Sequence, residues 1–318
     1  MAKAMILTDG KAGHENQSKA LARALGLDFE IAPVRFKSKF HKALSYLFDK
    51  IGVNARSLWE FTPEVYDSSR PLPPLPAPFK PAVIIGTGSG TFYPAKSLAR
   101  TLGVKSAVVL YPRGYNLKSF DCILAPSFDN PEDLSNVVKI PANFVSNDAK
   151  FYEDGVKAFG ERHPKSDKAA LAVIIGGSNK CSTMSADWMK AQLDEIFAKA
   201  GDCEKWVTTS RRTPADVESL VDSYQWDYKL IYSKDHFNPI PAFVALASRL
   251  YVTAESTGML SEAATCGCAE VYALDNLNPG PHKFRRFVET LRENGYVDGA
   301  RKVDLSREIA RAKELLGL

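Results

Sequence analysis

Residues 250–262 read LYVTAESTGMLSE, a short apolar run followed by small polar residues and then by a helix-like segment. The run Leu250–Val252 is apolar at consecutive positions, which is typical of a parallel strand covered on both faces. The turn that follows places Ser256 or Thr257 where a helix would begin, and both residue types are common N-caps. This stretch therefore predicts one strand–turn–helix unit of a doubly wound α/β fold.

The same unit recurs at four other places, each time as an apolar run that leads into a turn of small residues. The runs are Met5–Leu7, Ala82–Ile85, Leu171–Ile175 and Trp206–Thr209. Apolar strands that alternate with helical patterns are typical of parallel sheets with helices on both faces. The predicted fold class is α/β, with two doubly wound Rossmann-like domains that face a cleft.

The length of 318 residues suits about two domains. We place the boundary at the polar segment Gly160–Lys168, which gives an N-terminal domain over 1–160 and a C-terminal domain over 161–318. Near the end of the chain, apolar residues recur at helical spacing, at Leu305, Ile309, Ala312 and Leu316. They predict a final amphipathic helix that could pack back on the N-terminal domain.

Proline density marks one further segment of the chain. Residues 70–81 contain six prolines. Such density favours an extended backbone, and we interpret the segment as a connector rather than as a docking peptide.

Composition limits the classes of function. The chain is 45% hydrophobic and 25% charged, with a net charge of +4, which is typical of a globular protein that could bind a phosphorylated small molecule. That charge is too small to indicate nucleic acid as a partner. No apolar run approaches the ~20 residues of a membrane helix, and no signal-peptide pattern opens the chain. The five cysteines are expected to be reduced thiols, so the expected location is the cytoplasm.

Several known catalytic motifs are absent. Residues 86–91 read GTGSGT, with threonine at the third glycine of a dinucleotide fingerprint, and residues 176–181 read GGSNKC, which is not a Walker loop. The chain has neither a Gly-x-Ser-x-Gly elbow nor a His-Glu-x-x-His pair. Cys266-Gly267-Cys268 has no nearby histidine to complete a zinc site. We therefore predict no cofactor and no metal site.

The first candidate site is the turn at residues 9–14, which reads DGKAGH. Free amides at a helix start favour anions, which makes Gly13 a candidate substrate-binding residue, and they keep a nearby imidazole neutral. His14 is thus a candidate general base, or a residue that only hydrogen-bonds the loop. Asp9, at the end of the strand, either holds the loop or orients His14.

The second half of the chain offers phosphate-binding candidates after two strands. Gly176, Gly177 and Ser178 could bring backbone amides close to phosphate oxygens, or could simply form a turn. Arg211 and Arg212 suit phosphate because guanidinium groups donate paired hydrogen bonds, although adjacent arginines often form a solvated face.

The opening stretch supplies the remaining candidates. Ser256 and Thr257 could cap a helix whose first amides meet a diphosphate, and Glu262 could accept hydrogen bonds from a ribose. Alternatively, Glu262 is only a carboxylate stabilised by the helix dipole. Further candidates for lining the cleft are Asn143, Asn238 and Arg285.

Residues 252–267 resemble the donor-site signature of GT-B glycosyltransferases, a small-residue turn before a helix that bears Glu and then Gly. The loop 9–14 is similar to the Gly-Gly-His loop of the N-acetylglucosaminyltransferase that makes the peptidoglycan lipid precursor, where the histidine is a proposed base. A closer resemblance, over nearly the whole chain, is to the family named after a plant mitochondrial-fission factor, the "elongated mitochondria" family. Its matching segments are 8–17, 208–214, 238–239, 252–267 and 283–295. Two positions depart from that family's pattern, Ser89-Gly90 in place of a basic residue and Glu255 in place of aspartate.

The resemblance implies a metal-independent GT-B-like glycosyltransferase that uses a nucleotide-diphosphate sugar, of UDP type, held by the C-terminal domain. The N-terminal domain would bind a sugar or lipid acceptor. Two alternatives remain open: a nucleotide-sugar epimerase of the same build, with Glu15 and Glu255 as candidate carboxylates, and a non-catalytic recruitment scaffold. A lipid acceptor would place the protein at the periphery of the inner membrane, where the basic, aromatic segment Arg35–Lys42 could bind. Otherwise that segment is a solvated helix start.

Overall fold

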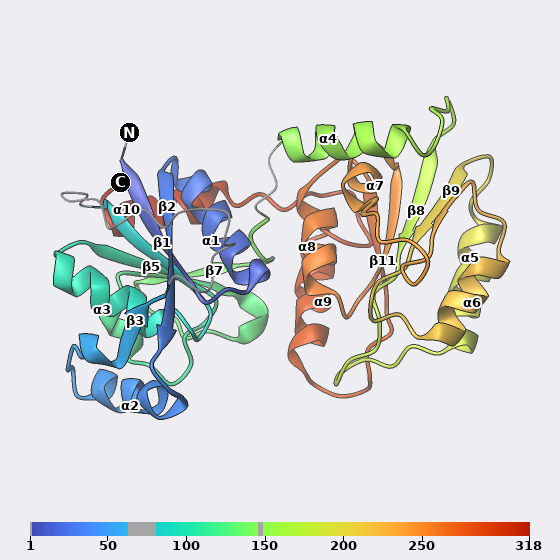
Figure 1. Ribbon diagram of the computed structural model, residues 1–318. Coiled ribbons are helices and arrows are strands. Elements are labelled where there is room, and N and C mark those ends of the chain that lie inside the picture. Colours follow the sequence, from blue (N-terminus) through green and yellow to red (C-terminus); the bar gives the residue numbers. More distant parts are fainter. Residues whose placement is uncertain (1, 63–80, 146–148) are drawn as a thin grey trace. The chain divides into compact units, whose positions relative to one another are not determined.

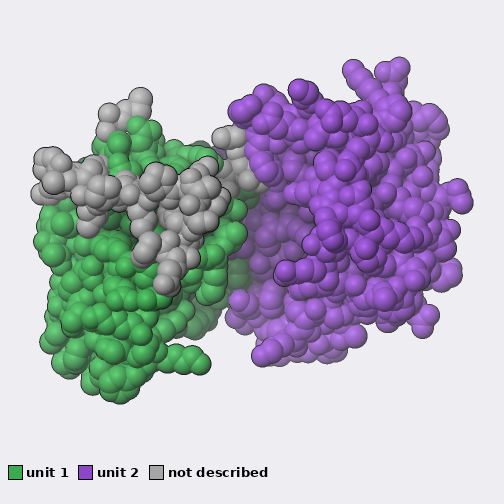
Figure 2. Space-filling model, in the orientation of Figure 1, with its two compact units in different colours: residues 1–140, 144–146, 305–318 green, residues 141–143, 147–304 purple. Residues whose placement is uncertain are grey.

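Short apolar strands and amphipathic helices alternate along the described chain, which comprises residues 2–62, 81–145 and 149–318 of a computed structural model. They assemble into two units (Figures 1 and 2). Residues 1–140, 144–146 and 305–318 form unit 1, and residues 141–143 and 147–304 form unit 2. Each unit has its own sheet, and the predicted α/β class with parallel sheets is confirmed.

Unit 1 has a seven-stranded sheet in the order β3-β2-β1-β4-β5-β6-β7. Neighbouring strands are parallel, except that β3 runs antiparallel to β2. The strands are β1 (Lys3–Thr8), β2 (Asp28–Phe36), β3 (Trp59–Phe61), β4 (Val83–Thr87), β5 (Lys105–Val109), β6 (Cys122–Pro126) and β7 (Val137–Ile140). The α-helices are α1 (Ala12–Leu25), α2 (Lys39–Lys50), α3 (Phe92–Leu102) and α10 (Ser306–Leu316).

Alternate residues of each strand point to opposite faces of this sheet. Ala4 and Ile6 of β1 lie in the core that the sheet forms with α1 and α10. Met5 and Leu7 lie in the core on the other face, which α3 covers. Because both faces are covered, the strands read as continuous apolar runs rather than as alternating ones.

Unit 2 has a five-stranded, fully parallel sheet in the order β10-β9-β8-β11-β12. The strands are β8 (Ala170–Ile174), β9 (Glu204–Thr208), β10 (Tyr228–Leu230), β11 (Arg249–Thr253) and β12 (Glu270–Leu274). The helices are α4 (Ala149–Gly160), α5 (Ala186–Ala198), α6 (Ala215–Ser223), α7 (Ile240–Leu246), α8 (Thr257–Thr265) and α9 (Lys283–Glu293). Figure 1 shows α5 and α6 on one side of this sheet and α8 and α9 on the other.

The division between the units differs from the predicted one after residue 160. Helix α4 precedes that point, yet it belongs to unit 2. Its Phe159 ring packs against Trp206 and Phe243, at centroid distances of 5.0 and 5.8 Å. The polar segment that we predicted as the boundary is instead the loop that leads from α4 into β8.

Two further sequence predictions concern the C-terminal helix and the proline-dense segment. The amphipathic helix predicted near the C-terminus forms α10, and it packs in unit 1 with Ala312 and Leu316 in the core. Most of the proline-dense segment, residues 70–80, lies outside the described residues.

Candidate functional site

In both sheets the first three strands are added toward one edge, and the chain then crosses back to add the next strand on the other side of the first one. The place where this direction reverses is called the switch point of the sheet. In unit 1 this point lies between β1 and β4, and in unit 2 it lies between β8 and β11. Loops that leave neighbouring strands in opposite directions open a crevice at their carboxyl ends, where α/β proteins bind ligands. Most of the predicted site residues follow three of these strands, β1, β8 and β11, and Arg211 and Arg212 follow β9.

In unit 1, Asp9 and His14 form a hydrogen-bonded pair at the switch point. Nδ1 of His14 lies 3.1 and 3.2 Å from the two carboxylate oxygens of Asp9. Because a carboxylate can only accept, Nδ1 carries the hydrogen, and Nε2 is left as a basic nitrogen. Lys11 Nζ lies 3.1 Å from the same carboxylate. Asp9 therefore orients His14, which is one of the two roles predicted for it.

The surroundings of Asp9 keep it ionised. Burial alone would raise its pKa, but hydrogen bonds from His14 and Lys11, and the charges of both, lower the pKa to about 2. The backbone N–H of Lys11 also donates to Asp9 Oδ1 over 3.4 Å, so the carboxylate holds the loop as well as the imidazole. An ionised Asp9 stabilises an imidazolium that forms when His14 accepts a proton.

The glycine-rich turn after β4 packs over this pair. Gly88 has a φ of +83°, and a Cβ there would collide with the ring of His14. A Cβ at Gly90 would lie 2.7 Å from Cβ of Asp9. These glycines, which fail as a dinucleotide fingerprint, are thus required by the close approach of two loops. Gly13, in contrast, is exposed in the first turn of α1.

In unit 2, the switch point is occupied by the buried side chain of Glu255. Its oxygens accept hydrogen bonds from the backbone N–H of Gly177 over 2.7 Å and from Nδ2 of Asn276 over 2.8 Å. The N–H of Gly176 donates to Thr253 Oγ1 over 2.8 Å. The N–H groups of Gly176 and Gly177 therefore already donate to side chains of the protein. Neither N–H is free to bind a phosphate, which is the role predicted for them. Ser178 accepts from the N–H of Met184 over 3.1 Å.

Beside this switch point lies a cavity of about 350 Å³, at the carboxyl ends of β9 and β10. Such a volume is within the range of small-ligand pockets, ~300–1,000 Å³. The predicted Arg211, Arg212 and Asn238 line it, together with Met259 from the first turn of α8. The remaining lining residues are Thr208, Thr209, Ser210, Tyr232, His236, Phe237, Pro239 and Ile240.

The aromatic residues of this cavity were missed by the sequence analysis. Tyr232 and Phe237 come from the loop after β10, and the Tyr232 and His236 rings lie 4.6 Å apart. Aromatic faces next to two guanidinium groups can bind a planar base and an anion together. Arg212 also reaches Glu255, with 3.8 Å between Nη2 and Oε1.

The site residues predicted around α8 do not all lie at the cavity. Helix α8 begins at Thr257 with Ser256 as its N-cap residue, and the Ser256 side chain makes no capping hydrogen bond. Glu262 does not line the cavity. Its Oε1 accepts a hydrogen bond from Tyr152 of α4 over 3.0 Å. Of the other candidates, Asn143 donates its N–H to Ser261, and Arg285 pairs with Asp275.

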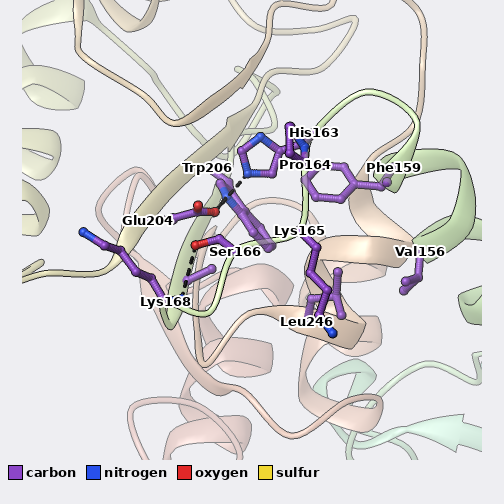
Figure 3. Close-up of a pocket in the computed structure, with 12 residues that line it drawn as sticks. Val156, Phe159, His163, Pro164, Lys165, Ser166, Lys168, Glu204, Trp206 and Leu246 are labelled. Carbon is purple, nitrogen blue, oxygen red and sulfur yellow. Dashed lines mark hydrogen bonds and ion pairs between the residues drawn. The ribbon is translucent and has the colours of Figure 1, made fainter.

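A larger cavity, of about 470 Å³, lies at the opposite edge of the unit 2 sheet, where β8 and β9 begin (Figure 3). Its walls are largely apolar, with Phe159, Trp206 and Leu246 around it. Glu204 accepts hydrogen bonds from His163 and from the Trp206 indole over 2.9 and 2.8 Å. None of the site residues predicted from the sequence lines this cavity, which is lined in part by the segment Gly160–Lys168.

The described part of the chain offers neither a metal-binding cluster nor a membrane-spanning helix. No three His, Cys, Asp or Glu side chains gather there in a way that could hold a metal ion. No helix there has the length and apolar character to cross a bilayer. All five cysteines are free thiols.

Comparison with known proteins assigns the chain to a family. The family model described as mitochondrial fission ELM1 matches residues 12–313. The chain belongs to this ELM1 family. The match includes His14, but not Asp9, and it includes the residues that line the Arg211–Arg212 cavity.

Two relatives align with different shares of this ELM1 family member. Mitochondrial fission protein ELM1 of Arabidopsis thaliana is 24% identical over 93% of this chain and 83% of its own length. The uncharacterized protein RP120 of Rickettsia prowazekii (strain Madrid E) is 31% identical over 56% of this chain. The matched part spans about half, 52%, of RP120.

Solved structures with a similar fold have low sequence identity to this ELM1 family member. A UDP-GlcNAc 2-epimerase from Methanocaldococcus jannaschii matches with a TM-score of 0.55 and 15% identity, covering 99% of this chain and 92% of its own. One from Neisseria meningitidis, bound to UDP-GlcNAc, matches with a TM-score of 0.50 and 12% identity, covering 99% and 98%. The GT-B-like fold is thereby confirmed.

Proposed function

We propose that this chain is a GT-B-like glycosyltransferase that binds a nucleotide-diphosphate sugar in unit 2 and transfers the sugar to a hydroxyl acceptor. The observation that carries the proposal is the cavity that Arg211 and Arg212 line at the carboxyl edge of the unit 2 sheet. That is where α/β sheets bind nucleotides, and paired guanidinium groups match a diphosphate.

The diphosphate of the donor has candidate partners in unit 2. Arg211 and Arg212 would neutralise the charge that develops on the departing diphosphate, and such interactions raise the rate. The first turn of α8, with Ser256 and Thr257, would supply amides and hydroxyl groups to the same phosphates. Glu262, which Tyr152 holds outside the cavity lining, is assigned no contact with the donor. Gly176 and Gly177, with Ser178 after them, would support the cavity from behind, because Ser210 donates to the Gly176 carbonyl over 2.7 Å and Gly177 packs against Arg212. The UDP-GlcNAc held by the Neisseria structure of the same fold supports a UDP-type donor.

The acid–base group of the proposal is the Asp9–His14 pair of unit 1, with Gly13 in the anion-binding turn beside it. Nε2 of His14 would take the proton from the acceptor hydroxyl, because Asp9 holds Nδ1. The acceptor is a sugar or a lipid-linked sugar. The reaction would need no metal and would occur in the cytoplasm or at the periphery of the inner membrane.

The epimerase alternative has less support than the transferase, because its two candidate carboxylates already have partners. It needs free carboxylates at the sugar, and the candidates were Glu15 and Glu255. Glu255 is 2% exposed and holds two loops together. Glu15 is paired with Lys19 over 2.6 Å. The scaffold alternative is favoured by the Arabidopsis relative, whose name records mitochondrial fission.

A thermal-shift screen tests the proposal. The purified chain is heated with UDP, GDP, CMP, dTDP and ADP and with matched sugar conjugates. A nucleotide at 100 times its Kd adds about 2.7 kcal/mol to the free energy of unfolding, and we expect this stabilisation with one base. The Arg211→Ala variant should lose part of it, because the diphosphate loses a hydrogen-bond donor in the cavity.

Two outcomes separate the alternatives. If no nucleotide stabilises the protein, the transferase and epimerase proposals both fail and the scaffold remains. If a sugar conjugate stabilises the protein and its sugar changes configuration without any acceptor, as followed by proton NMR, the protein is an epimerase.

A further inference from the structure

The outward surface of α2 carries a concentration of exposed apolar side chains. Eight large hydrophobic residues are exposed among the described residues, and four of them lie between positions 40 and 53. They are Phe40, Leu47, Ile51 and Val53, with exposed fractions of 68, 54, 62 and 44%. The cost of exposing such side chains makes a concentration of them typical of a binding surface.

Three of these side chains form one stripe on the helix. Phe40, Leu47 and Ile51 are separated by seven and four residues, which places them on one face at 3.6 residues per turn. The opposite side of α2 faces unit 1, because Ser45 and Asp49 are buried there. Leu44, Tyr46 and Phe48, on the flanks between the two sides, pack against the core of unit 1. Phe40, Leu47 and Ile51 are not among the described residues that form or flank the two cores of unit 1. Figure 1 shows α2 at the edge of that unit.

The charged residues of the segment that carries the stripe are mostly basic. Residues 35–56 contain six lysines and arginines and a single acid, Asp49. Asp49 is 3% exposed and forms an ion pair with the buried Lys96, so it contributes no negative charge to the surface. Lys37, Lys39 and Lys50 are exposed, and none of them forms an ion pair with a described residue.

We propose that this surface, defined by Phe40, Leu47 and Ile51 with Lys37, Lys39 and Lys50, binds an anionic lipid bilayer. A helix that combines an apolar stripe with lysines is typical of binding in the plane of a membrane interface. Lysine is depleted at the centres of protein–protein interfaces, whereas its long stem lets the ammonium reach lipid phosphates beside inserted apolar groups. The inference does not depend on the proposed enzymatic function.

Cosedimentation with vesicles tests this inference. The full chain is mixed with vesicles of phosphatidylcholine, or of phosphatidylcholine with phosphatidylglycerol, in the absence of nucleotide. We expect binding to the second composition only, weakening as salt is added. Each of Lys37→Gln, Lys39→Gln and Lys50→Gln should weaken binding about fivefold.

The apolar stripe is tested by the triple variant Phe40→Ser, Leu47→Ser, Ile51→Ser. Its targets are exposed, so its melting temperature should equal that of the wild type while vesicle binding is lost. Leu246→Ser, which changes a leucine of unit 2 that is 48% exposed, is the matched control and should bind normally. Binding that survives the triple variant, or no binding by the wild type, would overturn the proposal. So would self-association that depends on the stripe in the absence of lipid. A failed nucleotide screen would leave the vesicle result unaffected.

Discussion

His14→Ala is expected to lower turnover by about 10²–10⁴-fold, which is the typical contribution of general acid–base catalysis. Alanine removes Nε2, the nitrogen that Asp9 leaves basic by holding Nδ1. The measurement is the rate at which nucleoside diphosphate is released from the donor that the thermal-shift screen identifies. Donor affinity should be unchanged, because the nucleotide residues belong to unit 2. Asp9, whose pKa is about 2, stays ionised throughout an assay near neutral pH.

Glycine variants separate loss of His14 from general damage to unit 1. Gly88→Ala would push the His14 ring out of place and should reproduce most of the loss. Gly103→Ala introduces a similar strain at a φ of +63°, but a Cβ there meets no atom within 4 Å, so turnover should be retained. Turnover of His14→Ala equal to that of the wild type would remove this residue from the mechanism.

Lys96→Met is expected to lower the free energy of unfolding by about 3–5 kcal/mol, the usual cost of leaving one partner of a buried ion pair alone. Lys96 and Asp49 have side chains that are 3 and 2% exposed, and they join α3 to α2. Lys96 also donates to Ser119 over 2.8 Å and lies 4.5 Å from the centroid of the Phe120 ring. Urea unfolding of the variant measures the change.

A double variant distinguishes the lost pair from lost packing. Asp49→Asn together with Lys96→Met removes the unpaired charge and keeps an acceptor for the N–H of Asn116, which donates to Asp49 over 2.5 Å. It should therefore be more stable than Lys96→Met alone. Lys190→Met, in an exposed pair with Asp194, should cost only about 0.3–0.5 kcal/mol. A cost for Lys96→Met as small as that of Lys190→Met would contradict this account.

The strands that carry the site could be predicted because their apolar runs are local patterns. The runs at Met5–Leu7 and Leu250–Val252 lie within β1 and β11. Residues that directly follow parallel strands share one edge of a sheet, so Asp9 and Arg211 could be placed there from order alone. The start of α8 at Thr257 was predicted in the same way from its capping residues.

Contacts over long sequence distances could not be predicted from these patterns. The N–H of Gly177 is taken by Glu255, 78 residues away, and Glu262 is held by Tyr152, 110 residues away. Both partners are ordinary polar residues in the sequence, and only the fold brings them together. The predicted boundary after residue 160 differs from the division into units for a related reason, because a polar loop between a helix and a strand resembles a linker.

The aromatic residues of the cavity were not marked by a periodic sequence pattern. Tyr232 and Phe237 follow β10, a strand of three residues that is too short to show a period. A search for aromatic residues just after each strand of unit 2 could have found them. Gly88 and Gly90 were visible as part of a glycine-rich turn. That turn was compared only with the dinucleotide fingerprint, which it does not match, so its role in the contact between two loops was not predicted.

The central claim is that the cavity lined by Arg211 and Arg212 holds a nucleoside diphosphate. Titration calorimetry tests it most directly, with the nucleoside diphosphate that gives the largest thermal shift. Hydrogen bonds from a charged group contribute about 1.5–3 kcal/mol, so Arg211→Ala should raise Kd by about tenfold to a hundredfold. Lys199→Ala, which removes an exposed cation at the C-cap of α5 and outside the cavity, should leave Kd unchanged. Equal affinity of the wild type and Arg211→Ala, or no binding heat with the wild type, would contradict the claim.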